Sequence, residues 1–223
     1  MTKTVILRAL TPANSLRLVM GATVAAGALL TGMPAFAADH ESDRSEGVQS
    51  STQQRPGQVT ADAVLQIAES QVGVTENAAG GGTPFHEWYM SSQRAQETVA
   101  RDGGNVRAYA NAPWCAMFVS WVGEKAGARL TVGWDAYTVT WAKWFQDNGR
   151  WGTKPKPGAV VYFSWDGKTV NSIDHMGLVK QDNRNGTITT IEGNTGNGKV
   201  EERIRPKSDV VGYGYPEYRD VQV

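Results

Sequence analysis

The chain has 223 residues, of which 40% are hydrophobic, and its 22 basic residues balance 22 acidic ones. This neutral charge gives no indication of a nucleic-acid partner. One cysteine in the whole chain excludes an internal disulfide framework, so the composition indicates a globular protein whose chemistry rests on individual residues.

The first 37 residues have the features of an export signal. Three basic residues precede an apolar stretch over residues 18–30, and Ala-Phe-Ala at 35–37 fits a signal-peptidase site. The apolar stretch is too short, and too rich in Gly and Ala, for a membrane span. We therefore expect a secreted mature chain that begins at Ala38, carries 19 basic and 22 acidic residues, and does not remain at the membrane.

The mature chain divides into two segments. Residues 38–59 are polar and lack apolar periodicity, which predicts a disordered leader. Residues 60–223, about 160 residues without an internal repeat, suffice for one domain with a substantial core.

The first half of this domain has the periodicity of helices. Thr60 is a suitable N-cap for a helix that stops before Gly73. A Gly-rich loop over residues 73–84 and an aromatic cluster over 85–89 follow, and residues 91–109 predict a helix and then a loop.

Residues 111–121 (N-A-P-W-C-A-M-F-V-S-W) contain the one cysteine, Cys115. Proline is tolerated in a first helical turn, so Pro113 predicts a helix capped at Asn111 or Ala112. Apolar residues at steps of three and four indicate one buried face on this helix. The residues of that face are Trp114, Phe118, Trp121, Val122 and Lys125.

Two interpretations of Cys115 compete. A thiol in a first helical turn faces unpaired backbone N–H groups and the positive end of the helix dipole, which both favour the thiolate. Free cysteine is also common as a small buried apolar residue. Export favours the reactive interpretation, because a leftover thiol in an oxidising compartment suggests an intermolecular bridge or a reactive group.

The second half of the domain changes from helix to strand. A helix is predicted over residues 138–148 with Gly149 as its stop, and a turn over 154–158. β-Branched and aromatic residues then predict an antiparallel sheet, which makes the domain α+β. The predicted strands cover residues 159–164, 176–181, 187–192 and 210–215.

His175 and Glu192 lie on neighbouring predicted strands, and their pairing depends on the turn. A turn at Asn183-Arg184 places His175 opposite Glu192 and pairs apolar residues with apolar residues. A turn at Asn185-Gly186 has the better hairpin signal but matches the faces poorly. We prefer the first register, in which the carboxylate fixes the tautomer of an imidazole that accepts a proton from Cys115.

Four motifs in order resemble the CHAP family of cysteine amidohydrolases and peptidases: residues 114–121, 157–163, 174–179 and 192–195. The resemblance implies a papain-like α+β fold, with the nucleophile on a helix packed on an antiparallel sheet. It implies that the nucleophile is Cys115, the base His175, the orienting carboxylate Glu192 and an accompanying polar residue Asn194.

The chain departs from the family in two places. Ala159 stands where the family often has aspartate, a position that we interpret as structural. The acidic calcium-binding loop of some members is missing, so we expect neither a metal nor a cofactor. His86 has no partner at ligand spacing, so a surface or packing role is preferred to metal binding. We expect three residues to contact the substrate: Trp114, Asn111 and Trp165.

The resemblance and the export signal together imply a monomeric secreted hydrolase that cleaves an amide bond in cell-wall peptidoglycan. The bond can be N-acetylmuramoyl-L-alanine or one in the stem or cross-bridge peptide. Two alternatives stay open at this point: a secreted cysteine peptidase that acts on protein, and a non-catalytic wall-binding module.

Overall fold

A computed structural model describes residues 59–219. The predicted export signal, and all of the predicted leader except Val59, lie outside the described residues. Within the described part, no helix is long and apolar enough to cross a membrane. The α-helices are α1 (Ala61–Glu69), α2 (Pro84–Ser91), α3 (Gln93–Asp102), α4 (Cys115–Lys125), α5 (Arg129–Val132) and α6 (Thr138–Asp147), with 3₁₀ helices η1 (Val106–Asn111), η2 (Val170–Ser172) and η3 (Lys207–Asp209).

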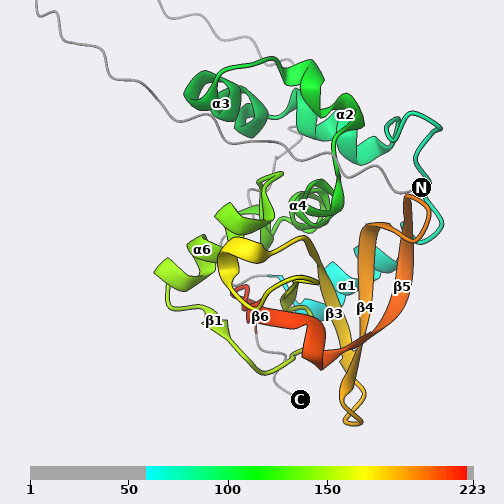
Figure 1. Cartoon of the computed structure of the whole chain (residues 1–223), viewed down its shortest axis with the longest axis vertical. Helices are drawn as coiled ribbons and strands as arrows, with labels where there is room; N and C mark the ends of the chain where they lie inside the picture. The colour runs from blue at the N-terminus through cyan, green and yellow to red at the C-terminus, as the bar shows by residue number, and fades with distance from the viewer. Residues whose placement is uncertain (1–58, 220–223) are drawn as a thin grey trace, which may run out of the picture. The chain divides into compact units, whose positions relative to one another are not determined.

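The helices precede a six-stranded sheet in which every pairing is antiparallel. The strand order is β1-β6-β2-β3-β4-β5, so the predicted α+β class is confirmed, and the arrangement is consistent with a papain-like CHAP fold (Figure 1). Two of the strands, β1 and β5, were not predicted. The strands are β1 (Trp151–Gly152), β2 (Val160–Phe163), β3 (His175–Asp182), β4 (Thr187–Thr195), β5 (Lys199–Pro206) and β6 (Val210–Gly214).

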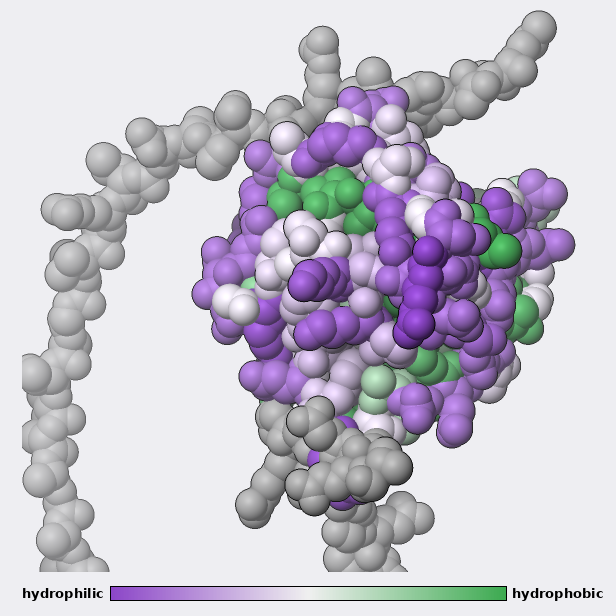
Figure 2. Space-filling view, turned by 90° about the horizontal axis from the view of Figure 1, so that it is seen from below, coloured by the Kyte–Doolittle hydropathy of each residue, from purple (hydrophilic) through white to green (hydrophobic). Residues whose placement is uncertain are grey.

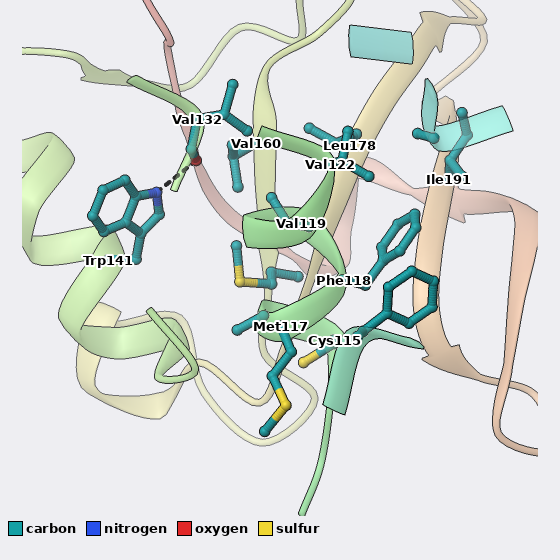
Figure 3. Close-up of a cluster of buried hydrophobic side chains, with 14 of the residues drawn as sticks. Cys115, Met117, Phe118, Val119, Val122, Val132, Trp141, Val160, Leu178 and Ile191 are labelled. Atoms are coloured by element: carbon teal, nitrogen blue, oxygen red, sulfur yellow. Dashed lines mark hydrogen bonds between the residues drawn. The ribbon is translucent and has the colours of Figure 1, made fainter. Parts of the chain in front are cut away.

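Helix α4 lies between the sheet and α2, in contact with β3 and β4 (Figure 1). Figure 3 shows Phe118 and Val122 of α4 directed toward Leu178 of β3 and Ile191 of β4, and all four are fully buried. A Cβ on Gly193 would lie 2.6 Å from the Cβ of Phe118, so only glycine lets α4 approach β4 this closely.

The prediction for the start of α4, with a cap at Asn111 or Ala112, is wrong by two or three residues. The helix begins at Cys115, and Trp114 precedes it in a non-helical conformation with φ −121° and ψ 15°. The side chain of Trp114 is fully buried and its indole N–H donates to Glu76 at 2.7 Å. This contact with another loop holds Trp114 outside the helix, so Pro113 precedes the first turn.

The buried face of α4 is wider than predicted. All residues from Cys115 to Ser120 are buried, whereas Trp121 is half-buried and Lys125 is exposed. Because both the sheet and α2 contact the helix, burial extends around its first turns. Gly127 follows the helix with φ +69°, as expected of a glycine after a helix end.

The predicted register of β3 and β4 is also wrong. Leu178 pairs with Ile191, two residues away from the predicted partner Met176, and the register shifts again between Val179 and Gln181. The reason is a four-residue turn over 183–186, which neither predicted two-residue turn allowed for. A shift of two residues keeps every side chain on its face of the sheet, so His175 and Glu192 still share a face.

The face of the molecule seen in Figure 2 is mainly hydrophilic, with its apolar residues in separate small areas. The core lies instead between the helices and the sheet, and Trp141 illustrates how it is ordered. Its indole N–H donates to the Val132 carbonyl at 2.7 Å (Figure 3), which ties α6 to the end of α5.

Candidate active site

Cys115 is the first residue of α4 and its thiol is nearly buried, with 5% of the residue exposed. Among residues 59–219, no side chain caps this helix end. The backbone N–H groups of the first turn are therefore left without a side-chain acceptor and point toward the region of the thiol. A group that develops negative charge there would meet both these donors and the positive end of the helix dipole.

His175 begins β3 and lies between Cys115 and Glu192. Its Nε2 is 2.9 Å from Oε2 of Glu192, and only 8% of the residue is exposed. Because Nε2 contacts the carboxylate, Nδ1 is the ring nitrogen that remains for the thiol. The ring also stacks on Phe163, with 6.0 Å between centroids and 26° between planes. The imidazole is thus held on three sides.

The contacts of His175 determine its charge. Burial lowers the pKa of the imidazole, but hydrogen bonds with Cys115 and Glu192 outweigh this and raise the pKa to about 9. The imidazole is therefore protonated at neutral pH. The protonated ring is thus a proton donor in hydrogen-bond contact with Cys115.

Glu192 is fully buried, and all of its side-chain partners are hydrogen-bond donors. Oε1 accepts from Thr190 Oγ1 at 2.6 Å and from Arg205 Nε at 2.9 Å, and Oε2 accepts from Arg205 Nη2 at 2.6 Å. Burial raises the pKa of this carboxyl, but the hydrogen bonds from Arg205 and His175 lower it to about 2. Glu192 is therefore ionised throughout the physiological pH range.

Gly177 explains how Glu192 reaches His175 although the two are not directly opposite. Continued from the observed pairs, the register places Gly177 opposite Glu192. A Cβ on Gly177 would lie 2.7 Å from Cγ of Glu192. The missing side chain leaves space for the carboxylate to cross over Gly177 and meet the imidazole two residues away.

Arg205 is the residue of this site that the sequence did not reveal. It lies on β5, whose charged sequence K-V-E-E-R-I-R-P lacks the apolar alternation of a typical strand. One signal was available: a buried carboxylate needs donors or a cation, and the unassigned stretch after Glu192 contains two arginines, Arg203 and Arg205.

Asn194 takes no part in the hydrogen bonds of the imidazole among the described residues. The residue lies in an irregularity of the β4–β5 pairing with φ +54°, a left-handed conformation that asparagine tolerates. Among the described residues, its side chain forms no hydrogen bond with His175, whose Nε2 is taken by Glu192. Asn194 lies within β4, at the irregularity of its pairing with β5.

The three predicted substrate contacts have different surroundings. The indole of Trp114 is fully buried and belongs to the core, so it presents no surface to a substrate in this structure. Asn111 is exposed at the end of η1, and its side chain lies against Gly81. Trp165 is 48% exposed and lies near His175, with 6.4 Å between ring centroids. Of these three, Trp165 has the exposed aromatic surface next to the site.

His86 has the packing role that its sequence position suggested. The side chain is buried, with Nδ1 2.7 Å from Thr83 Oγ1 and Nε2 3.0 Å from the Ala112 carbonyl oxygen. Nε2 therefore ties α2 to the segment before Cys115, while Nδ1 contacts Thr83, the N-cap residue of α2 itself. Within residues 59–219, no group of three or more His, Cys, Asp or Glu residues is arranged to hold a metal ion.

A cysteine on a helix, with an imidazole and a carboxylate on an adjoining antiparallel sheet, is the arrangement of papain-like cysteine hydrolases. The family model of the CHAP domain matches residues 107–194, which confirms the predicted family and shows that the chain carries a CHAP domain. This domain implies hydrolase activity of the amidase or peptidase type. No curated protein matches the chain. Cys115, His175 and Glu192 lie inside the matched segment, and Arg205 lies beyond it.

Proposed function

We propose that the protein is a secreted cysteine hydrolase that cleaves an amide bond in peptidoglycan. The observation that carries this proposal is the contact of His175 with the ionised Glu192 beside a thiol at an uncapped helix end. The export signal in the sequence and the CHAP domain support the choice of an extracellular wall polymer as the substrate.

The first half of the reaction follows from the positions of Cys115 and His175. The thiolate attacks the amide carbonyl carbon, so that a C–S bond forms and the carbonyl oxygen becomes an oxyanion. Backbone N–H groups in the first turn of α4 donate to that oxygen. As the C–N bond breaks, the imidazolium gives its proton to the departing amine, and a thioester remains on Cys115.

Water completes the reaction. The imidazole of His175, now neutral, accepts a proton from a water molecule, whose oxygen attacks the thioester carbon. The C–S bond breaks, the product leaves as a carboxylic acid, and the proton restores the imidazolium beside a new thiolate. Glu192 stays ionised through both halves and stabilises each positive state of the ring.

The exposed ring of Trp165 supports a role in substrate binding. It stacks on Phe163 with 13° between planes and 5.7 Å between centroids, which fixes its orientation beside His175. A rigid aromatic face next to the reacting groups offers a surface on which a sugar ring or an apolar part of a peptide can lie.

The test is digestion of purified peptidoglycan by the mature protein, followed by mass spectrometry of the released fragments. Free stem peptides with a new L-alanine amine would identify an amidase, and shortened stems or opened cross-bridges would identify an endopeptidase. The Cys115→Ser variant is the matched control, and casein is the competing substrate. Cleavage of casein but not of peptidoglycan, or release of identical fragments by the serine variant, would refute the proposal.

A further inference from the structure

We propose that Arg205 is a positioning residue of this site, which holds the Glu192 carboxylate against His175 and fixes the aromatic wall beside it. The inference rests on the proposed hydrolase function and adds to it a residue from outside the matched CHAP segment.

The contacts of Arg205 define the geometry of the carboxylate. Its Nε and Nη2 donate to the two oxygens of Glu192 at 2.9 and 2.6 Å, a two-point contact that fixes both the position and the plane of the carboxylate. Nη2 also donates to Thr195 Oγ1 at 3.0 Å, which anchors the guanidinium itself. With this plane fixed, Oε2 is directed toward Nε2 of His175.

Arg205 also contacts the proposed substrate side of the site. Its Cζ lies 5.3 Å from the ring centroid of Trp165 and 5.6 Å from that of Phe163. A guanidinium attracts aromatic faces at such distances. One side chain therefore joins the carboxylate that orients His175 to the ring that we expect the substrate to meet.

The positive charge of Arg205 is part of this role, because a neutral side chain could not balance the charge of the buried Glu192 carboxylate. Glu192 is fully buried, and the Arg205 side chain is only 17% exposed, so little water screens the pair. Removal of a fixed positive charge makes every neighbouring acid hold its proton to a higher pH. The charged and titratable groups around the pair are Cys115 of α4, His175 of β3, Glu201 of β5 and Asp209 of η3.

The experiment compares Arg205→Met and Arg205→Lys with Arg203→Met in the mature protein. Arg203 is a matched control two residues away on β5, where it pairs with Glu201 and not with Glu192. For Arg205→Met we expect a loss in kcat of about tenfold or more, since charge-assisted hydrogen bonds are lost. Lysine keeps the charge but not the two-point contact, so Arg205→Lys should fall between. Arg203→Met should match the wild type.

A second readout separates positioning from simple stability. The rate of Cys115 alkylation by iodoacetamide against pH reports the thiolate without any substrate. In Arg205→Met the acid side of this profile should move to higher pH, while Arg203→Met leaves it in place. If Arg205→Met does not fold by circular dichroism, the kcat and alkylation profile of Arg205→Lys decide instead, and wild-type values there would overturn the inference.

A double-variant cycle tests whether Arg205 acts through Glu192. In a Glu192→Gln background, Arg205→Met should cost little further kcat, because residues that act as one unit are not additive. Full additivity, or a folded Arg205→Met with wild-type kcat and alkylation profile, would overturn the inference. Failure of the proposed function has a different signature: the wild type releases no fragments from peptidoglycan, while the alkylation profiles still separate Arg205→Met from Arg203→Met.

Discussion

Residues 59–219 contain two arginine–carboxylate pairs with a fully buried carboxylate, Arg205–Glu192 and Arg94–Asp135, that differ in chemistry. Arg205 donates to Glu192 through Nε at 2.9 Å, and Arg94 donates to Asp135 through Nε at the same distance. The side chains of both carboxylates are completely buried, and the two arginine side chains are 17% and 20% exposed. Burial does not distinguish the two pairs. Their geometry differs in one respect: Nε and Nη2 of Arg94 both donate to Oδ2 of Asp135, whereas Arg205 donates to both oxygens of Glu192.

The partner that each carboxylate has besides its arginine distinguishes the two pairs in their chemistry. Asp135 uses its second oxygen to accept the backbone N–H of Tyr137 at 3.0 Å, a group that does not titrate. Glu192 uses an oxygen to contact His175, an imidazole that titrates and is itself hydrogen-bonded to Cys115. A buried ion pair therefore contributes to a reaction when its carboxylate also contacts a titratable group of the site. The interaction energy of the pair itself does not decide this.

The Arg94 pair instead connects elements of the helical part. Arg94 belongs to α3, and Asp135 lies in the loop between α5 and α6. The backbone carbonyl of Asp135 accepts from Ser120 Oγ of α4 at 2.8 Å, so this loop is held from two sides. We interpret the pair as a tie that stabilises the helices around α4.

The strongest test of the comparison removes the nucleophile. If the Glu192 pair serves a reaction at Cys115, Cys115→Ser should keep the fold, because the volume changes little, and should lose roughly a million-fold in kcat. Iodoacetamide should label wild-type Cys115 well below pH 8.5, the pKa of about 8.5 being that of an ordinary free thiol. Hydrolysis at the wild-type rate by the serine variant, or an inert thiol in the native protein, would contradict this prediction. Both arginine–carboxylate pairs would then have only a structural role.

The next effect in size concerns Glu192. Glu192→Gln keeps a hydrogen-bonding side chain but loses a charge-assisted bond, which is worth roughly 1.5–3 kcal/mol, or about 10- to 150-fold in kcat. His175→Ala should lose more, because the proton-transfer group itself is gone. The double variant should resemble His175→Ala, as expected for residues that act together. Independent, additive losses would indicate that Glu192 acts on substrate binding instead.

Cys115, His175 and Glu192 could be found in the sequence because each lies in a short stretch with a recognisable helix or strand pattern. Cys115 begins an apolar periodic stretch, and His175 and Glu192 lie at the ends of the predicted strands over residues 176–181 and 187–192. The α+β class follows from the same patterns, because helix and strand periodicities occupy separate halves of the domain.

Arg205 could not be found in this way, because its contact spans 13 residues and lies on a strand with weak local signals. The edge strand β5 exposes Ile204 at 71%, so its apolar residues do not mark a buried face. The strand register was predicted wrongly for a related reason. The turn includes Arg184 with φ +57°, and arginine seldom adopts this left-handed conformation, so its presence in the sequence does not indicate such a turn. Trp114 illustrates another limit of the sequence. Hydrophobicity alone does not distinguish an aromatic ring that packs in the core from one that lines a binding groove.

The pH dependence of stability gives a test of intermediate size. The pKa of His175 is raised above its ordinary 6.5 to about 9, so its contribution to folding is complete below pH 6.5 and is lost as the pH rises through 9. The pKa of Glu192 is lowered from 4.5 to about 2, so its contribution is complete above pH 4.5 and is lost as the pH falls toward 2.

Urea denaturation of the mature protein should therefore show a decrease in the free energy of unfolding, of the order of a few kcal/mol, between pH 6.5 and 9.5. His175→Ala should remove most of that decrease. If the alanine variant keeps the full alkaline loss, other groups cause it, and the Glu192 pair is no more sensitive to pH than the Asp135 pair.

The smallest effect on catalysis is expected when the Arg94–Asp135 pair is disrupted. Such a variant is the most direct test of the difference between the two pairs. Arg94→Met leaves Asp135 buried without its cation, which should lower the free energy of unfolding by about 3 kcal/mol. Because Asp135 contacts no titratable group of the site, the surviving folded enzyme should keep kcat within about twofold of the wild type and an unchanged alkylation profile. Both should be measured well below the Tm of the variant, after thermal denaturation has established it. A shift in the alkylation profile equal to that of Arg205→Met would show that the distant pair also sets the charge of the site. The partner that each carboxylate has besides its arginine would then not be what separates the two pairs.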